Sequence, residues 1–348
     1  MEEIDLDELS KILSEEYKTE IKAIKLEKIS SGYHSDGFKI SCDNGKCFFI
    51  KRVKTKDMGY EVPERKVYSL LVGDAMSKRV GNEPRSVGVV VLNNKAVKIP
   101  EINEDSQFYH LQEFGADGVS YWSLLNERRQ KEKVDENDLR ELDLIVDFIA
   151  KVHSVKHPSC DREKLDAVYN DSLRSVLANP ELALMLLHDF PKDDKFMPLK
   201  TQKEIVGLMF EFMHKYKNRS DRLCALHGDF WGGNAFLKDG KLEVIDFSRI
   251  PWGDAGVDVG WWFSQYLAIY HQTKNKYFKE LGELFLKKYI EKTGDEEVLK
   301  SSGLVFGLLV AIYLSRRFYP VVEEEYARRF LKNVLEILKV GRIVWLEI

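Results

Sequence analysis

The sequence predicts an α+β protein with a small, strand-rich N-terminal part and a larger, mostly helical C-terminal part. Short runs rich in β-branched and aromatic residues, separated by turn residues, fill the chain up to about residue 114. Beyond that point, longer segments carry apolar residues at helical spacing. A glycine-containing stretch at 115–118 joins the two parts without a long linker. We therefore expect two domains, 1–114 and 115–348.

The N-terminal part is expected to contain about five antiparallel strands and one pair of helices. Helices are predicted at Leu6–Tyr17 and from Pro63 onward, and strands at Ala23–Ile29, Phe38–Cys42, Cys47–Val53, Val87–Leu92, Ala96–Ile99 and Phe108–Phe114. Asn44-Gly45 indicates a two-residue hairpin turn, which would set Cys42 and Cys47 opposite each other. We expect free thiols, because the four cysteines have neither metal-ligand spacing nor a disulfide framework.

A loop between the first two predicted strands is a candidate for binding phosphates. Ser31, Gly32 and Ser35 are small residues that allow backbone N–H groups to approach a phosphate closely. The outer glycines have the spacing of a Walker loop, but Phe38-Lys39-Ile40 replaces the Gly-Lys-Ser/Thr continuation, so a P-loop ATPase is disfavoured. A plain hairpin turn is the alternative for this stretch.

Lys51 lies among apolar residues on the third predicted strand and is a candidate for the α- and β-phosphates of a nucleotide. A lysine at a strand end is otherwise usually solvated, so this role needs an acidic partner on a nearby helix. The helix that starts at Pro63 offers Glu64, with Glu61 as the second choice.

In the larger part, Asn137 or Asp138 is expected to cap a helix that runs to His153. His153 lies on the apolar face of that helix, where a histidine is more often a hydrogen-bonded core residue than a ligand. The longest apolar run, Gly303 to Leu314, is too short to span a bilayer and suits a buried helix.

The most informative stretch runs from His227 to Asn234 and on to Asp246. Asp229, then an amide five positions later and a second acid at the end of an apolar run, have the spacing that phosphoryl transfer requires. One carboxylate must meet the acceptor hydroxyl while an amide oxygen and another carboxylate hold Mg²⁺ with ATP. Each residue alone could simply cap a turn. The joint pattern predicts a kinase with Asp229 as the catalytic acid and Asn234 and Asp246 as metal ligands.

With these motifs the chain resembles the aminoglycoside phosphotransferase and choline kinase superfamily, whose fold is bilobal and protein-kinase-like. Leu111-Gln112-Glu113, Ile149 to His153 and Gly253 to Asp258 are weaker matches to the same pattern. Ser248 replaces the glycine of the protein-kinase Asp-Phe-Gly step, which argues against a regulated protein kinase, and Ala255 replaces the usual proline of this superfamily.

The resemblance assigns further roles in the site. It implies that Lys51 and Glu64 form the ion pair that positions phosphate and that Asp258 holds the catalytic loop through hydrogen bonds. The adenine-contacting hinge would consist of Gln112, Glu113, Phe114 and Gly115.

The acceptor is left open by the sequence. Trp231 with Gly233-Asn234 is similar to the fructosamine kinase branch, whereas Phe247 after Asp246 departs from it. Ketosamines, amino alcohols, nucleosides and aminoglycosides all remain candidates. An acidic loop with Asp189, Asp193 and Asp194 could attract a cationic acceptor, or be merely solvated, and Arg316-Arg317 could attract an acidic one.

Composition excludes several other classes. A net charge of −4 with interleaved signs gives no basic footprint for nucleic acid. The acidic start of the chain lacks the apolar core of a secretory signal, so we expect a cytoplasmic protein without membrane contact. From the kinase motifs we expect its partner to be a small molecule with a hydroxyl group. No Gly-x-Ser-x-Gly elbow supports a hydrolase. A non-catalytic nucleotide-binding regulator of the same fold is the main alternative, although it would normally lack one of the four residues Lys51, Asp229, Asn234 and Asp246.

Overall fold

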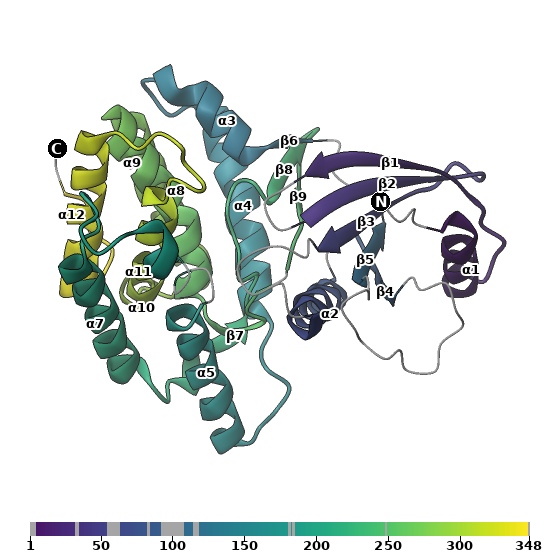
Figure 1. The fold of residues 1–348 in the computed structure, drawn as a ribbon, viewed down its shortest axis with the longest axis horizontal. Coiled ribbons are helices and arrows are strands. Elements are labelled where there is room, and N and C mark those ends of the chain that lie inside the picture. The colour runs from purple at the N-terminus through teal and green to yellow at the C-terminus, as the bar shows by residue number, and fades with distance from the viewer. Residues whose placement is uncertain are drawn as a thin grey trace. The chain divides into compact units, whose positions relative to one another are not determined.

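Two units make up the chain in the computed structural model (Figure 1). The structure describes residues 5–31, 35–53, 63–81, 84–91, 108–113, 118–179, 182, 185–247 and 249–346. The smaller unit lies within 1–117 and also includes 243–249, and the larger unit lies within 118–242 and 250–348. A single cut of the chain therefore does not separate them, because the segment after residue 242 packs with the smaller unit. The mixed α+β architecture expected from the sequence is confirmed.

An antiparallel sheet of five strands forms the smaller unit, in the order β1-β2-β3-β5-β4. Its strands are β1 (Ala23–Ser31), β2 (Ser35–Cys42), β3 (Cys47–Val53), β4 (Ser86–Val91) and β5 (Phe108–Glu113). The predicted strand at Ala96–Ile99 lies outside the described residues. Two helices, α1 (Leu6–Tyr17) and α2 (Pro63–Val80), complete the unit. Helix α2 contacts β4 and β5.

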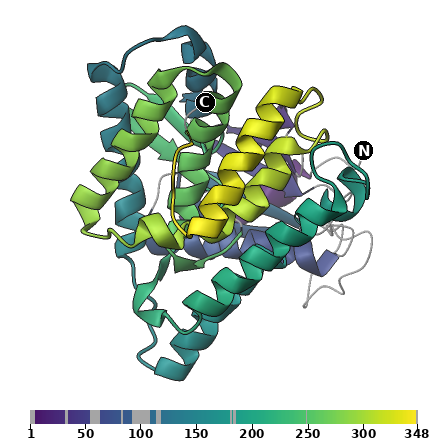
Figure 2. The same ribbon diagram turned by 90° about the vertical axis from the view of Figure 1, so that its left-hand side faces the viewer.

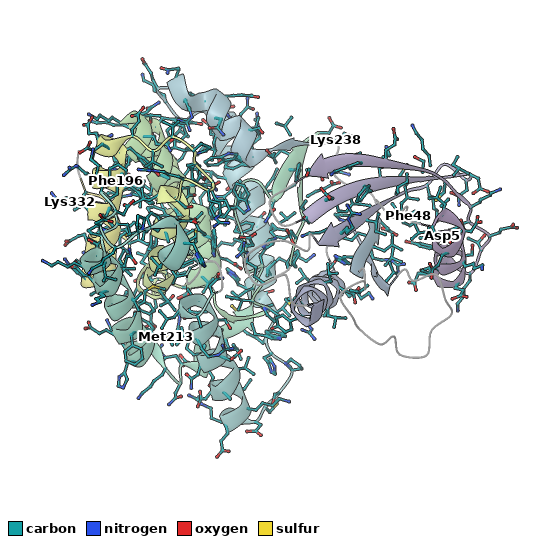
Figure 3. All side chains as sticks on the ribbon, viewed as in Figure 1. Asp5, Phe48, Phe196, Met213, Lys238 and Lys332 are labelled. Atoms are coloured by element: carbon teal, nitrogen blue, oxygen red, sulfur yellow. The ribbon has the colours of Figure 1, made fainter. Side chains whose placement is uncertain are left out.

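Helix α1 covers one face of this sheet. Asp5 caps its first turn by accepting hydrogen bonds from the N–H groups of Asp7 and Glu8 (Figure 3). Leu9 and Leu13, four positions apart, pack into a core that includes Phe48. Because side chains alternate along a strand, the residues next to Phe48 face the other side of the sheet. The bounds predicted for α1 are correct.

The hairpin between β2 and β3 differs from the sequence-based prediction. The Cys42 N–H donates to the carbonyl of Lys46 at 2.9 Å, and the Gly45 N–H donates to the carbonyl of Cys42 at 3.1 Å. Gly45 has a φ of 80°, so the loop has three residues, a turn followed by a left-handed glycine, and not two. Ser41 therefore pairs with Cys47, and the predicted Cys42–Cys47 pair is wrong. Both cysteines are free thiols, as expected.

Helices dominate the larger unit, with α8 and α11 buried along nearly their whole length. Helix α11 contacts α5, α7, α8 and α12, and Figure 2 shows α11 and α12 side by side. Among the described residues, no helix is both long enough and apolar enough to cross a membrane. The α-helices are α3 (Tyr121–Glu127), α4 (Glu136–Ser154), α5 (Arg162–Leu177), α7 (Leu199–Tyr216), α8 (Gly256–Thr273), α9 (Lys276–Thr293), α10 (Val298–Ser301), α11 (Gly303–Leu314) and α12 (Glu324–Val340).

Short elements connect these helices. The described residues include two small sheets. One pairs β7 with β10, and the other contains three strands in the order β6-β8-β9. The strands are β6 (Val119–Ser120), β7 (Leu223–Ala225), β8 (Ala235–Lys238), β9 (Lys241–Val244) and β10 (Trp252–Asp254), and the single helical turns are η1 (Arg128–Gln130), η2 (Met185–Asp189) and η3 (Ser220–Arg222).

The start of α4 corrects another prediction. Asp135 caps this helix, where Asn137 or Asp138 was expected. The Asp135 side chain accepts from the N–H groups of Asn137 and Asp138, and the Asp138 carboxylate accepts in return from the Asp135 N–H. This reciprocal arrangement is a capping box. Asp138, one of the two residues predicted to cap the helix, is instead the third helical residue, which hydrogen-bonds back to the cap.

A buried ion pair joins η3 to β10. Arg222 donates from Nε to Asp254 Oδ2 at 2.6 Å and from Nη2 to Asp254 Oδ1 at 3.0 Å. Asp254 also accepts from Tyr169, Ser301 and the Gly256 N–H. Burial alone would raise the pKa of Asp254, but the Arg222 guanidinium and the other donors hold the pKa below its ordinary value.

Replacing Arg222 by methionine should lower the free energy of unfolding by about 3–5 kcal/mol, because Asp254 then remains as a buried charge without its cation. Urea denaturation of the two proteins measures the difference. Lys287→Met is the control, since Lys287 and its partner Glu291 are 69% and 63% exposed and should contribute less than about 1 kcal/mol. Equal changes in the two variants would contradict the importance assigned to this ion pair.

Candidate active site

The loop between β7 and β8, residues 227–234, carries the acid and the amide singled out by the sequence. Gly228 gives the loop its first bend: its φ is 82°, and a Cβ there would lie 2.6 Å from the Ile250 nitrogen. Only glycine combines that backbone conformation with so close a neighbour. A tight turn ends the loop, where the Asn234 N–H donates to the carbonyl of Trp231 at 3.0 Å.

Asp229 and Asn234 contact each other across this turn. Asn234 Nδ2 donates to the carbonyl of Asp229 at 2.9 Å and reaches the Asp229 carboxylate at 3.3 Å. The Asp229 N–H donates to His227 Nδ1 at 3.2 Å, so His227 braces the loop. Both Asp229 and Asn234 are only 8% exposed. Both side chains are therefore buried and held by contacts within the loop itself.

Asp258, near the start of α8, holds the other end of the loop. Its two carboxylate oxygens accept from the N–H groups of His227 at 2.7 Å and Gly228 at 2.8 Å. His153 Nε2 lies 3.2 Å from the same carboxylate, and His153 Nδ1 lies 2.7 Å from the hydroxyl of Tyr289. The predictions that Asp258 holds the loop and that His153 is a satisfied core histidine are confirmed.

In the smaller unit, Lys51 and Asp246 form an ion pair with 2.6 Å between Nζ and Oδ1. Asp246 follows β9 and has a φ of 71°, a left-handed conformation that is uncommon outside glycine. Gly73 of α2 admits the neighbouring backbone, because a Cβ at Gly73 would lie 3.1 Å from the carbonyl oxygen of Phe247. The smaller unit therefore brings together a cation on β3 and an acid from a distant segment of the chain.

His110 lies beside this pair and was not identified from the sequence. It is directly opposite Lys51 in the β3–β5 register, so both side chains leave the same face of the sheet. His110 Nε2 lies 2.7 Å from the Ser86 hydroxyl, which donates to Asp74 at 2.7 Å. Burial, and to a smaller extent the charge of Lys51, lower the pKa of His110 to about 4, although Asp74 and Asp246 act in the opposite direction. The imidazole is thus neutral beside the lysine.

The other expected nucleotide residues are only partly described. Ser31 ends β1 and donates to Asp36, and Ser35 begins β2. Gln112 is buried on β5, while the Glu113 side chain accepts from the Tyr17 hydroxyl at 2.7 Å. Glu64 lies in α2, but its side chain is outside the described part of the structure, as are Gly32, Glu61, Phe114 and Gly115.

The two charged candidates for the acceptor region neutralise each other. Arg317 Nη2 donates to Asp189 at 2.8 Å, and the Ser315 hydroxyl donates to the same carboxylate. Asp194 accepts from the N–H groups of Phe196 and Met197 and so stabilises its own turn. Asp189 and Arg317, which were expected to attract acceptors of opposite charge, are therefore paired with each other.

The sequence analysis also missed Gln265 on α8, which is fully buried and accepts from the Gly232 N–H at 3.0 Å. A signal for it was present. Gln265 interrupts a long apolar run seven positions after Asp258, a spacing that places both residues on one face of the helix.

A five-stranded unit with a strand lysine paired to an aspartate, and a helical unit whose buried loop presents an aspartate and an asparagine, define a kinase-like phosphotransferase fold. The profile of the phosphotransferase enzyme family, APH, matches residues 90–298, a stretch that includes the loop, Asp246 and Asp258. The chain therefore belongs to this family, as its sequence motifs indicated, and is a phosphotransferase.

Solved structures share the fold at low identity. A thermostable mutant of aminoglycoside phosphotransferase APH(4)-Ia, in ternary complex with AMP-PNP and hygromycin B, has a TM-score of 0.54 and 12% identity over 94% of this chain and 97% of that chain. A proposed fructosamine-3-kinase from Haemophilus somnus 129PT has a TM-score of 0.53 and 15% identity over 94% of this chain and 96% of that chain. The amicoumacin kinase hAmiN in complex with AMP-PNP, Ca²⁺ and Ami has a TM-score of 0.51 and 12% identity over 89% of this chain and 88% of that chain. No curated protein sequence matches the chain.

The low pKa of His110 predicts a pH dependence of stability. The unfolded chain binds a proton at His110 below a pH of about 6.5, whereas the folded protein does so only near pH 4. Stability from this residue is therefore lost as the pH falls through that window, by about 1.4 kcal/mol per pH unit. Urea denaturation between pH 7 and 5 should give a shallower slope for His110→Gln than for the unchanged protein, and parallel slopes would refute the buried neutral imidazole.

Proposed function

We propose that this phosphotransferase is an ATP- and Mg²⁺-dependent kinase that transfers the γ-phosphoryl group to a hydroxyl of a small metabolite or an aminoglycoside-like acceptor. The observation that carries the proposal is the contact of Asn234 Nδ2 with Asp229, 3.3 Å to the carboxylate and 2.9 Å to the carbonyl. Phosphoryl transfer depends mainly on alignment and electrostatic stabilisation, and this contact fixes an acid beside an amide.

Asp229 is the proposed catalytic residue. Its carboxylate would orient the acceptor hydroxyl and take its proton as the hydroxyl oxygen bonds to the γ-phosphorus and ADP leaves with the bridging oxygen. The backbone on both sides of Asp229 is held by His227 and Asn234, which favours a single orientation of the carboxylate.

Asn234 and Asp246 are proposed to hold the divalent cation. Because the Asn234 NH₂ group donates to Asp229, its carbonyl oxygen is the atom left for a ligand, and Mg²⁺ prefers oxygen ligands. Asp246 supplies a carboxylate on a backbone in the left-handed conformation, which is uncommon outside glycine and which functional sites sometimes use to direct a side chain. When bound, the cation neutralises charge on the phosphate oxygens. The Ca²⁺ and AMP-PNP in the hAmiN structure are consistent with this use of a metal and a nucleotide.

Lys51 is proposed to contact the nucleotide phosphates, with Glu64 as its partner on α2. The loop after β1, with Ser31, Gly32 and Ser35, would approach the phosphates, and the segment from Gln112 to Gly115 would contact adenine. A non-catalytic regulator is the weaker alternative, because this chain retains the lysine, both acids and the asparagine. An ATP-dependent reaction also agrees with the expected cytoplasmic location.

A ketosamine is the second candidate acceptor, favoured by the aromatic side of the loop. The rings of Trp231 and Trp122 lie 5.9 Å apart, and both side chains are partly exposed. Aromatic surfaces with a few polar groups are typical of small-molecule sites, and they suit the carbon face of a sugar-derived chain. Screening ATP consumption against ketosamines, amino alcohols, nucleosides and aminoglycosides identifies the acceptor.

Asp229→Ala should lower turnover by a factor of about 10²–10⁴, the usual effect of removing a positioned proton acceptor, while Mg·ATP still binds. Steady-state kinetics with the acceptor from the screen, together with calorimetric titration of Mg·AMP-PNP, separates the two effects. Asp171→Ala is the matched control, since the Asp171 side chain is 60% exposed and its carboxylate pairs with the neighbouring Arg174. Normal turnover by Asp229→Ala would remove Asp229 from the catalytic role.

Asp246→Asn should weaken binding of Mg·AMP-PNP at least about tenfold, because the variant loses the charge that attracts the cation. The same titration in EDTA should show little difference between the variant and the unchanged protein, since no cation is then present. An unchanged affinity for Mg·AMP-PNP would count against Asp246 as a metal ligand.

A further inference from the structure

One face of helix α8 contacts the loop 227–234 at several points between His227 and Gly232. Asp258, Trp262 and Gln265 are four and three positions apart, so they share that face. Asp258 binds the N–H groups of His227 and Gly228, and Trp262 packs against Phe230 with 4.5 Å between ring centroids. Gln265 accepts from the Gly232 N–H. The order of contacts along the helix follows the order of residues along the loop.

Gln265 has a single hydrogen-bond partner in the described part of the structure. Its side chain is fully buried, and its Oε1 lies 3.0 Å from the Gly232 nitrogen. A backbone N–H can only donate, so the oxygen of the Gln265 amide, and not its NH₂ group, must face Gly232. Its Nε2 has no hydrogen-bond partner among the described residues. A buried side-chain amide whose NH₂ group lacks a hydrogen-bond partner is unfavourable for folding. The one hydrogen bond that the Gln265 side chain makes among the described residues is to the loop.

Gly232 is also held from its other side by a neighbour anchored on the same helix. The Trp122 N–H donates to the Gly232 carbonyl at 3.0 Å. The preceding Tyr121 stacks on Trp262 at 5.2 Å, and its hydroxyl lies 2.9 Å from that of Tyr266. A Cβ at Gly232 would lie 2.7 Å from Gln265 Oε1 and 2.8 Å from the Trp122 nitrogen. The peptide groups on both sides of Gly232 are thus fixed with respect to α8.

Gly232 lies inside the turn that brings Asn234 back to Asp229. The turn is closed by the Asn234 N–H and the Trp231 carbonyl, and the Asn234 side chain then reaches Asp229. A shift of Gly232 would therefore alter the distance between the acid and the amide. We infer that Gln265 is a positioning residue, which fixes Asn234 relative to Asp229 through Gly232. The inference rests on the function proposed above.

Three variants separate positioning from a general contribution to folding. Gln265→Met keeps the length of the side chain and removes the acceptor. Gln265→Glu keeps an acceptor oxygen and removes the NH₂ group. Ser264→Ala is the matched control, because Ser264 is the equally buried neighbour on α8 and its hydroxyl donates to the Trp261 carbonyl, away from the loop.

The first measurement is residue-resolved hydrogen exchange of the Gly232 amide. In the unchanged protein this amide should exchange as slowly as the buried backbone of α8. Gln265→Met should accelerate Gly232 at least about tenfold without accelerating α8, whereas Gln265→Glu and Ser264→Ala should keep it protected. Free exchange of Gly232 in the unchanged protein would overturn the inference even if no variant folds.

The second measurement is hydrolysis of Mg·ATP with water as the acceptor. Gln265→Met should lower kcat about 10- to 100-fold, the cost of a misplaced reacting group, with little change in KM. Gln265→Glu should recover most of that loss. Equal kcat values for Gln265→Met and Ser264→Ala, or a change in KM alone, would overturn the positioning role.

Failure of the proposed function gives a different result. If the unchanged protein neither binds nor hydrolyses Mg·ATP, the kinase assignment is wrong. The exchange comparison would still decide whether Gln265 fixes Gly232.

Discussion

The carboxylate of Asp258 is the constraint on which the active-site loop depends. It is fully buried, and its oxygens accept from two consecutive N–H groups, those of His227 and Gly228, and contact His153. A buried carboxylate is stable only when such donors surround it. Because Gly228 must also pass close to Ile250 in a left-handed conformation, the backbone has one path, and Asp229 follows immediately. The position of Asp229, the proposed catalytic residue, is therefore determined by a buried carboxylate on a different element, helix α8.

The same helix explains why the loop has one conformation along its length. Residues of α8 are buried from Gly256 to His271, so the helix cannot shift without repacking α9 and α11 around it. Asp258, Trp262 and Gln265 connect this packed helix to the loop at Gly228, Phe230 and Gly232. A site held on a packed helix is more precisely defined than a site held by loops alone.

The sequence predicted those features that local patterns determine. The bounds of α1 follow from apolar spacing after Asp5, the spacing of Asp229 and Asn234 singled out both residues, and the resemblance to a known family indicated Asp258. It failed where a neighbouring residue competes for the same role: Asp135 caps α4 in place of Asp138, and Gly45 takes the bulge position in the hairpin. It also could not reveal contacts between distant segments. Nothing local to Asp189 or Arg317 shows that the two opposite charges meet, and nothing near Lys51 shows that Asp246 is its neighbour.

Asp246 shows how the smaller unit stabilises an unfavourable backbone conformation. A non-glycine residue in the left-handed region is strained by about 1–3 kcal/mol unless its surroundings stabilise it. For Asp246 the stabilisation comes from the ion pair with Lys51 and from α2, where Gly73 lets the Phe247 carbonyl approach closely. A side chain at residue 73 would press on Phe247 and so displace the acid before it. The backbone conformation of Asp246 thus depends on both Lys51 of β3 and Gly73 of α2. The role of each of these three residues becomes clear only from its contacts with the other segments.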